Sequence, residues 1–155
     1  MPHIVPAHTA EHLAAIRELF GEYAASLPFA LDFQGFDVEL ATLPGKYAPL
    51  DGALLLLLDG DGPAGCVALR PLAGEGLCEM KRLYVRSDRR SKGYGRLLAE
   101  AVLVAARALG YRRIRLDTVP GMDAAIALYG SLGFVSIAPY CHNPVPGAKF
   151  LEKVL

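Results

Sequence analysis

A short basic segment with two glycines, RRSKGYGRLLAE at residues 89–100, has the residue types and spacing of an anion-binding loop. Four positive charges stand around the glycines, at Arg89, Arg90, Lys92 and Arg96. The apolar residues that follow predict a helix beginning near Gly95, and backbone N–H groups at a helix N-terminus lack intrahelical acceptors and attract phosphate. Glycine lets a ligand approach that backbone closely. The segment therefore predicts a phosphate cradle.

The glycine spacing does not fit the two commonest nucleotide-binding motifs. A dinucleotide fingerprint requires a third glycine where this chain has Leu98, and a P-loop requires lysine where it has Arg96. The alternative to a ligand site is a solvated basic turn, because two nearby glycines alone are a weak signal.

Basic residues are concentrated in one part of a chain that is neutral overall. The 155 residues include 16 Lys and Arg and 16 Asp and Glu. Residues 81–96 contain seven of these basic residues and only one acid, Asp88. Neutrality of the whole chain argues against a general binder of nucleic acid or of an anionic membrane. The local excess predicts a target that is small and carries several negative charges.

The cysteines and histidines do not predict a metal site. The three cysteines lack C-x-x-C spacing, and the two histidines at helical spacing, His8 and His12, have no nearby third ligand. We therefore expect no metal, and reduced, buried thiols in a cytoplasmic protein. The segment MPHIVPAHTAEH lacks the pattern of an export signal, and no apolar run approaches the ~18 residues of a membrane span.

Hydrophobic periodicity predicts elements in the order β-α-α-β-β-β-α-β-α-β-β. Strands are expected at residues 2–7, 53–59, 65–72, 77–85, 111–119, 134–140 and 148–155. Helices are expected at residues 10–27, 36–44, 95–110 and 122–133. This order implies an α/β fold in one domain, 1–155, with a mixed, mostly antiparallel sheet, a central βαβ crossover and helices on both faces.

Three segments in register, EMKRLYV, RRSKGYG and ALYGSLGF, resemble the Gcn5-related N-acetyltransferase (GNAT) superfamily. That family's signature for acetyl-coenzyme A is Gln/Arg-x-x-Gly-x-Gly/Ala, which Arg90, Gly93 and Gly95 match. Its last helix commonly carries a tyrosine ahead of a Gly-Phe pair, here Tyr129 before residues 133–134. The resemblance runs from about residue 50 to the C-terminal end. It implies a GNAT-like fold and an N-acetyltransferase with acetyl-coenzyme A as cosubstrate.

The resemblance also implies which residues hold the coenzyme. The backbone amides from Ser91 to Arg96 would bind the diphosphate, with Arg90 and Lys92 as charged support. The strand before the loop is expected to splay from its neighbour, so that its exposed edge pairs with the pantetheine arm. An N–H near Leu83 would polarise the thioester carbonyl. The implied coenzyme-binding residues are Leu83, Tyr84, Val85, Arg90, Ser91, Lys92, Gly93, Tyr94, Gly95 and Arg96.

Acetyl transfer to an amine requires an uncharged amine and a proton for the departing thiolate. Glu79 lies eleven residues before Arg90, the offset of the catalytic glutamate in some family members, which implies a general base. An ion pair with a neighbouring basic residue on the sheet and a water relay that ends in backbone carbonyls are its alternatives. Tyr129 has the family position of the general acid, and core packing is its alternative. The family's coenzyme-binding asparagine is replaced here by Met122, to which no role is assigned.

Family resemblance places the acceptor pocket between residues 26–36 and 139–147. A primary amine of a small molecule or a peptide is the expected acceptor, and its identity stays open. A sensor or regulatory module that binds acyl-coenzyme A without turnover is the alternative function. Family members are often dimers, so a homodimer is an expectation by analogy alone.

Overall fold

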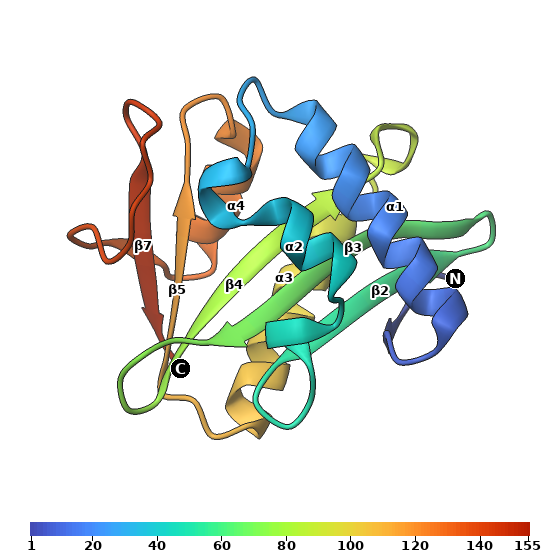
Figure 1. Cartoon of the computed structure of the whole chain (residues 1–155), viewed down its shortest axis with the longest axis horizontal. Helices are drawn as coiled ribbons and strands as arrows, with labels where there is room; N and C mark the ends of the chain where they lie inside the picture. The colour runs from blue at the N-terminus through green and yellow to red at the C-terminus, as the bar shows by residue number, and fades with distance from the viewer.

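The computed structural model describes all 155 residues and contains one mixed sheet of seven strands (Figure 1). The order across the sheet is β1-β2-β3-β4-β5-β7-β6, and only the β4–β5 pair is parallel. The strands are β1 (His3–Pro6), β2 (Ala53–Asp59), β3 (Gly62–Pro71), β4 (Leu77–Val85), β5 (Arg113–Thr118), β6 (Val135–Ser136) and β7 (Lys149–Val154). The expected sheet, with its βαβ crossover, is confirmed.

Helices cover both faces of this sheet, as the sequence predicts. They are α1 (Ala10–Ser26), α2 (Phe36–Ala41), α3 (Tyr94–Ala108) and α4 (Asp123–Ser131). In Figure 1, α1 and α2 lie in front of the sheet and α3 lies behind it. None of these helices combines the length and the apolar character needed to cross a membrane.

The leucine run in β2 shows how one strand serves two cores. Leu55 and Leu57 belong to the hydrophobic cluster that includes α3 and α4. Leu54 and Leu56 belong to the cluster that includes α1 and α2. Successive side chains of a strand point to opposite faces, so a strand buried on both sides must be apolar throughout.

Two strands near the C-terminal end are shorter than predicted. β6 contains only Val135–Ser136 of the expected 134–140, although the Ile137 N–H still bonds the Phe150 carbonyl at 2.9 Å. Pro139, which lacks an N–H, lies two residues further on and cannot extend the ladder. β5 begins at Arg113 instead of residue 111.

Strands β4 and β5 separate after their first three paired residues. Their ladder joins Leu77, Cys78 and Glu79 to residues 113–115 and then stops. In the β3–β4 ladder, three residues of β4 span the distance of two in β3, and the inserted Arg82 has a left-handed φ of 61°. A bulge of this kind bends a strand and redirects its side chains. The β5-facing edge of β4 is therefore unpaired from residue 80 onward.

Candidate functional site

Seven successive backbone amides at the start of α3 have no acceptor within the protein. The N–H groups of residues 90–96 donate no hydrogen bond, and the next one, from Leu97, bonds the Gly93 carbonyl at 3.1 Å. Ser91 and Gly93 have left-handed φ values of 64° and 79°. Left-handed residues among right-handed ones turn successive N–H groups toward a common concavity that suits anions. A Cβ added to Gly93 would meet no protein atom within 4 Å, so the space beside the loop is open and fits a phosphate group.

Much less free positive charge surrounds this loop than the sequence indicates. Five of the seven basic residues in 81–96 form ion pairs with acids, in the pairs Lys81–Asp117, Arg82–Glu39, Arg86–Glu22, Arg89–Asp59 and Arg96–Glu100. Arg90 and Lys92 have no acidic partner. The positive field for an anion therefore comes from these two side chains and from the free amides. Most of the positive charge predicted for residues 81–96 instead forms ion pairs within the fold.

Two side chains of the predicted loop make contacts within the protein, so they stabilise the fold. Tyr94 is buried in the core beneath α3, and its hydroxyl donates to Oδ2 of Asp59 at 3.2 Å. The guanidinium of Arg96 donates to Oγ of Ser131 on α4 at 2.6 Å. Any contact of Tyr94 with a ligand must therefore come from its backbone N–H.

Arg90 lies back against the end of β4. Its Nε donates to the Val85 carbonyl at 3.0 Å, and its guanidinium carbon lies 5.8 Å from the centroid of the Tyr84 ring. The backbone of Val85 was expected to face the pantetheine arm. Its carbonyl already accepts one hydrogen bond, so only one of its lone pairs remains for a ligand.

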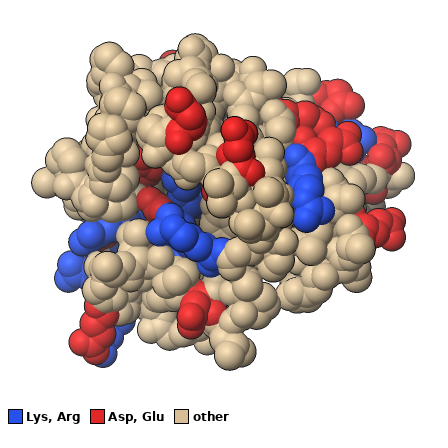
Figure 2. Space-filling view, in the orientation of Figure 1, with Lys and Arg blue, Asp and Glu red and all other residues tan.

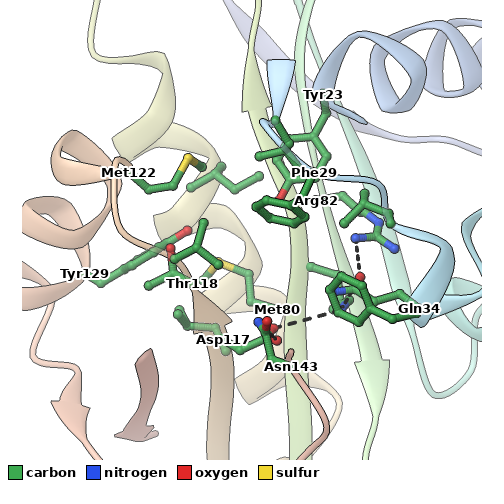
Figure 3. A pocket seen from close by; sticks show the side chains of 17 residues that line it. Tyr23, Phe29, Gln34, Met80, Arg82, Asp117, Thr118, Met122, Tyr129 and Asn143 are labelled. Atoms are coloured by element: carbon green, nitrogen blue, oxygen red, sulfur yellow. Dashed lines mark hydrogen bonds and ion pairs between the residues drawn. The ribbon is translucent and has the colours of Figure 1, made fainter. Parts of the chain in front are cut away.

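A pocket occupies the gap between the separated strands (Figure 3). Its walls include Leu83 from β4, Leu116 from β5 and Tyr129 from α4, together with residues from the end of α1 and the loop that follows. Tyr129 is 7% exposed, and its hydroxyl points into the pocket without a hydrogen-bond partner from the protein. Burial raises the pKa of this tyrosine. The hydroxyl therefore stays protonated at neutral pH and has a proton to donate.

Met122 lines the same pocket beside Tyr129, with its thioether directed inward (Figure 3). The usual asparagine would present an amide here, whereas a thioether is only a weak acceptor. Met122 therefore cannot make the polar contact that the resemblance implies for an asparagine at this position.

Glu79 lies in a second pocket that shares a wall with the first. This pocket is lined by Phe33, Gln34, Glu39, Arg70, Glu79, Lys81, Arg82, Asp117, Cys141 and His142. Glu79 is only 3% exposed, and one of its oxygens accepts a hydrogen bond from the Tyr140 hydroxyl at 2.6 Å. Its other oxygen lies 3.7 Å from Nε of Arg70. Glu79 and Tyr129 thus face neighbouring compartments, and Glu79 has the sheet ion pair that was its alternative role.

The wall between the two pockets contains residues that sequence reasoning missed. Nζ of Lys81 donates to Oε1 of Gln34 at 2.9 Å and lies 4.0 Å from Oδ1 of Asp117. Burial lowers the pKa of Lys81, and the carboxylate of Glu79 opposes this shift. Asp117 also accepts a hydrogen bond from Asn143 at 3.0 Å. Asp117 stands in the polar phase of the alternating strand RIRLDT, as Arg113 and Arg115 do, so no sequence signal set it apart.

Arg82 connects the bulge in β4 to Gln34, near the end of the first expected acceptor segment, and to Glu39 of α2. Its guanidinium donates to both oxygens of Glu39, at 2.8 and 3.0 Å, and to Oε1 of Gln34 at 2.6 Å. The Arg82 side chain is 2% exposed and that of Glu39 is 16% exposed. The pair therefore fixes α2 against the strand that borders both pockets.

Glu39→Ala should lower the free energy of unfolding by about 3–5 kcal/mol, because it leaves the buried Arg82 charge without its partner. Urea denaturation measures the change. Glu18→Ala, which removes a 67% exposed partner of Arg86, is the control and should cost less than about 1 kcal/mol. Equal effects of the two substitutions would show that Arg82 does not depend on Glu39.

The two segments expected to surround an acceptor lie next to each other. Phe29 and Phe33 from the first segment line a shallow pocket with residues 144–146 of the second. The rings of Phe33 and His142 meet edge to face, with centroids 6.4 Å apart. This surface adjoins the compartment that contains Glu79.

Comparison with known proteins gives a match to one family model. The model described as the acetyltransferase (GNAT) family matches residues 14–134, which include β4, the glycine loop and α4.

Relatives and solved structures agree with this match over nearly the whole chain. An uncharacterized N-acetyltransferase of Schizosaccharomyces pombe is 40% identical over 143 residues, covering 92% of this chain and 88% of its own length. An acetyltransferase from Streptococcus agalactiae superposes with a TM-score of 0.78 at 22% identity, covering 99% of this chain and 98% of its own. The yncA protein of Salmonella typhimurium, solved with its cofactor acetyl-CoA, superposes with a TM-score of 0.77 at 21% identity. The match covers 99% of this chain and 94% of the yncA chain.

Proposed function

The chain belongs to the acetyltransferase (GNAT) family, and from that premise we propose that it transfers the acetyl group of acetyl-coenzyme A to the primary amine of an acceptor by direct attack. Bound acetyl-coenzyme A would supply an activated thioester and a thiolate leaving group. The fold neighbour solved with acetyl-CoA supports this choice of donor. Because the family match covers residues 14–134 and the ends of the chain supply β1 and β7, we assign the activity to a single domain, 1–155.

The free amides of residues 90–96 are the observation that carries the proposal. We propose that the amides from Ser91 to Arg96 hold the diphosphate, with added positive charge from Arg90 and Lys92. The unpaired edge of β4 around Leu83–Val85 would then pair with the peptide-like pantetheine arm. The arm then ends in the pocket that Tyr129 lines. This arrangement needs no large rearrangement of the sheet, because β4 and β5 are already separated.

Two side chains have the positions to move protons. Glu79, in the adjoining compartment, would take the proton of the amine through water, which leaves a lone pair free to form the C–N bond. The Tyr129 hydroxyl would donate a proton to the sulfur as the C–S bond breaks. Burial raises the pKa of Tyr129, so the hydroxyl keeps its proton at neutral pH until the thiolate leaves.

Release of free coenzyme A from acetyl-coenzyme A over a panel of primary amines tests the proposal. We expect turnover with at least one amine and slow hydrolysis without any. Tight coenzyme binding with no turnover on any acceptor would favour the alternative, a non-catalytic acyl-coenzyme A sensor.

Glu79→Gln should lower kcat/KM roughly tenfold to a hundredfold at neutral pH, because the amide keeps the hydrogen bond of Tyr140 but cannot accept a proton. The loss should shrink as the pH approaches about 10.4, the usual pKa of a lysine-like amine, since the acceptor then loses its proton to solvent. Steady-state rates from pH 7 to pH 10 measure this. Glu100→Gln on α3 is the control.

If the loss stays constant across this pH range, or if there is no loss, the proton leaves through a water relay that ends in backbone carbonyls. Glu79 is then only a partner of Arg70. The rest of the proposed function would be unaffected.

A further inference from the structure

Arg70, on β3 directly opposite Glu79, has a guanidinium that makes no hydrogen bond with the protein. Its Nε is shielded from solvent and has no hydrogen-bond partner, and its side chain is 28% exposed. The neighbouring arginines differ, because Arg82, Arg86 and Arg115 donate to carboxylates at 2.8, 2.8 and 2.7 Å. Glu79 forms an ion pair with Arg70, but the 3.7 Å between its oxygen and Nε is too long for a hydrogen bond. A shielded donor without an acceptor is costly, so a guanidinium that faces a pocket without any hydrogen bond points to an acceptor that arrives with a ligand.

The other charges of this compartment already have partners of their own. Arg82 is held by Glu39, and Lys81 lies between Gln34 and Asp117. Figure 2 shows Lys and Arg side chains (blue) gathered in a hollow left of centre on this face of the molecule. Among the cations that line the hollow, Arg70 is therefore the one whose hydrogen-bonding capacity remains unused.

We infer that the acceptor is an amino acid or a related small amino carboxylate, and that Arg70 binds its carboxylate. This inference rests on the proposed function and specifies the substrate class of the same site. The planar fork of a guanidinium matches a carboxylate with two parallel hydrogen bonds.

The remaining groups of the compartment suit the other end of such a molecule. Asp117 lines both this compartment and the Tyr129 pocket, and Glu79 lines this compartment beside Arg70, so the two carboxylates would attract an ammonium group before it loses its proton. A phosphate in the place of the carboxylate would bring more negative charge close to Glu79, which lies 3.7 Å from Arg70. The charges therefore favour a ligand with one positive and one negative end.

The experiment compares matched acceptors that differ only in the carboxylate. The twenty common amino acids are assayed beside the amines that lack the carboxylate, at fixed acetyl-coenzyme A, with the parent chain and with Arg70→Gln. We expect at least one amino acid to exceed its matched amine about tenfold to a hundredfold in kcat/KM, and we expect Arg70→Gln to bring this ratio close to one. The ratio is the readout because Arg70 also lies 3.7 Å from Glu79, so the substitution can change the rates of both substrates together. Arg107→Gln, on the exposed face of α3, is the control and should change neither.

Calorimetric titration of the same pairs into the coenzyme A-bound protein separates this inference from the proposed function. Equal rates and affinities for amino acids and matched amines, or equal losses for both in Arg70→Gln, would overturn the inference and leave the acetyltransferase intact. Binding of amino acids that depends on Arg70, without turnover, would support the inference and contradict the proposed enzyme. If no amino acid binds at millimolar concentration, the inference is wrong.

Discussion

Gly93→Val should weaken binding of acetyl-coenzyme A about a hundredfold or more. A valine side chain would project into the open space beside the loop, where the diphosphate must approach the amides, and several charge-assisted hydrogen bonds of about 1.5–3 kcal/mol each would be lost together. Isothermal titration calorimetry with acetyl-coenzyme A measures the change in Kd.

Strain must be separated from steric blocking, because Gly93 has a φ of 79° that valine adopts poorly. Gly110→Val is the matched control, since Gly110 has a φ of 87°, no protein atom within 4 Å of its added Cβ, and a position at the opposite end of α3. Both variants should lose similar stability in thermal unfolding, but only Gly93→Val should lose coenzyme. Normal binding by Gly93→Val would show that the diphosphate does not lie on this loop.

Tyr129→Phe should lower kcat about 10²- to 10⁴-fold while the Kd for acetyl-coenzyme A changes less than about twofold. The substitution removes the proton donor but keeps the ring, which packs against Phe134 with centroids 5.7 Å apart. Single-turnover acetyl transfer measures the rate of the chemical step, and titration with acetyl-coenzyme A measures the Kd.

The pH profile adds a second readout for this residue. Because burial raises the pKa of Tyr129, the parent enzyme should show no fall in rate from ionisation of this group below about pH 10. Tyr111→Phe, which loses a hydrogen bond to the Asp51 carbonyl on the far side of the core, is the control and should keep its kcat. Unchanged kcat in Tyr129→Phe would mean that the tyrosine is only a core residue.

Local sequence signals predicted the fold well where a pattern depends on neighbours in the chain. β2 and β4 have the predicted bounds, because each is a continuous run of strand-forming residues ended by glycine or by charged loop residues. The glycine loop was also predictable, since left-handed backbone at Gly93 and a helix start beside it leave a local signature.

Local sequence patterns could not predict contacts between residues that are far apart in the chain. The sequence predicted free charge at Arg82 and Arg89, because the acids that pair with them, Glu39 and Asp59, lie far away along the chain. The lack of a hydrogen bond at Arg70 also depends on the positions of residues distant in the chain, so no local pattern predicts it. The bulge at Arg82 likewise has no sequence signal, because arginine rarely adopts a positive φ.

A crystal structure of the chain grown with acetyl-coenzyme A tests the central claim most directly. We expect diphosphate oxygens within hydrogen-bonding distance of the main-chain nitrogens of residues 91–96, and a thioester that ends beside the Tyr129 hydroxyl. Those nitrogens bonded to protein or water alone, with the nucleotide bound elsewhere or absent at saturating concentration, would contradict it.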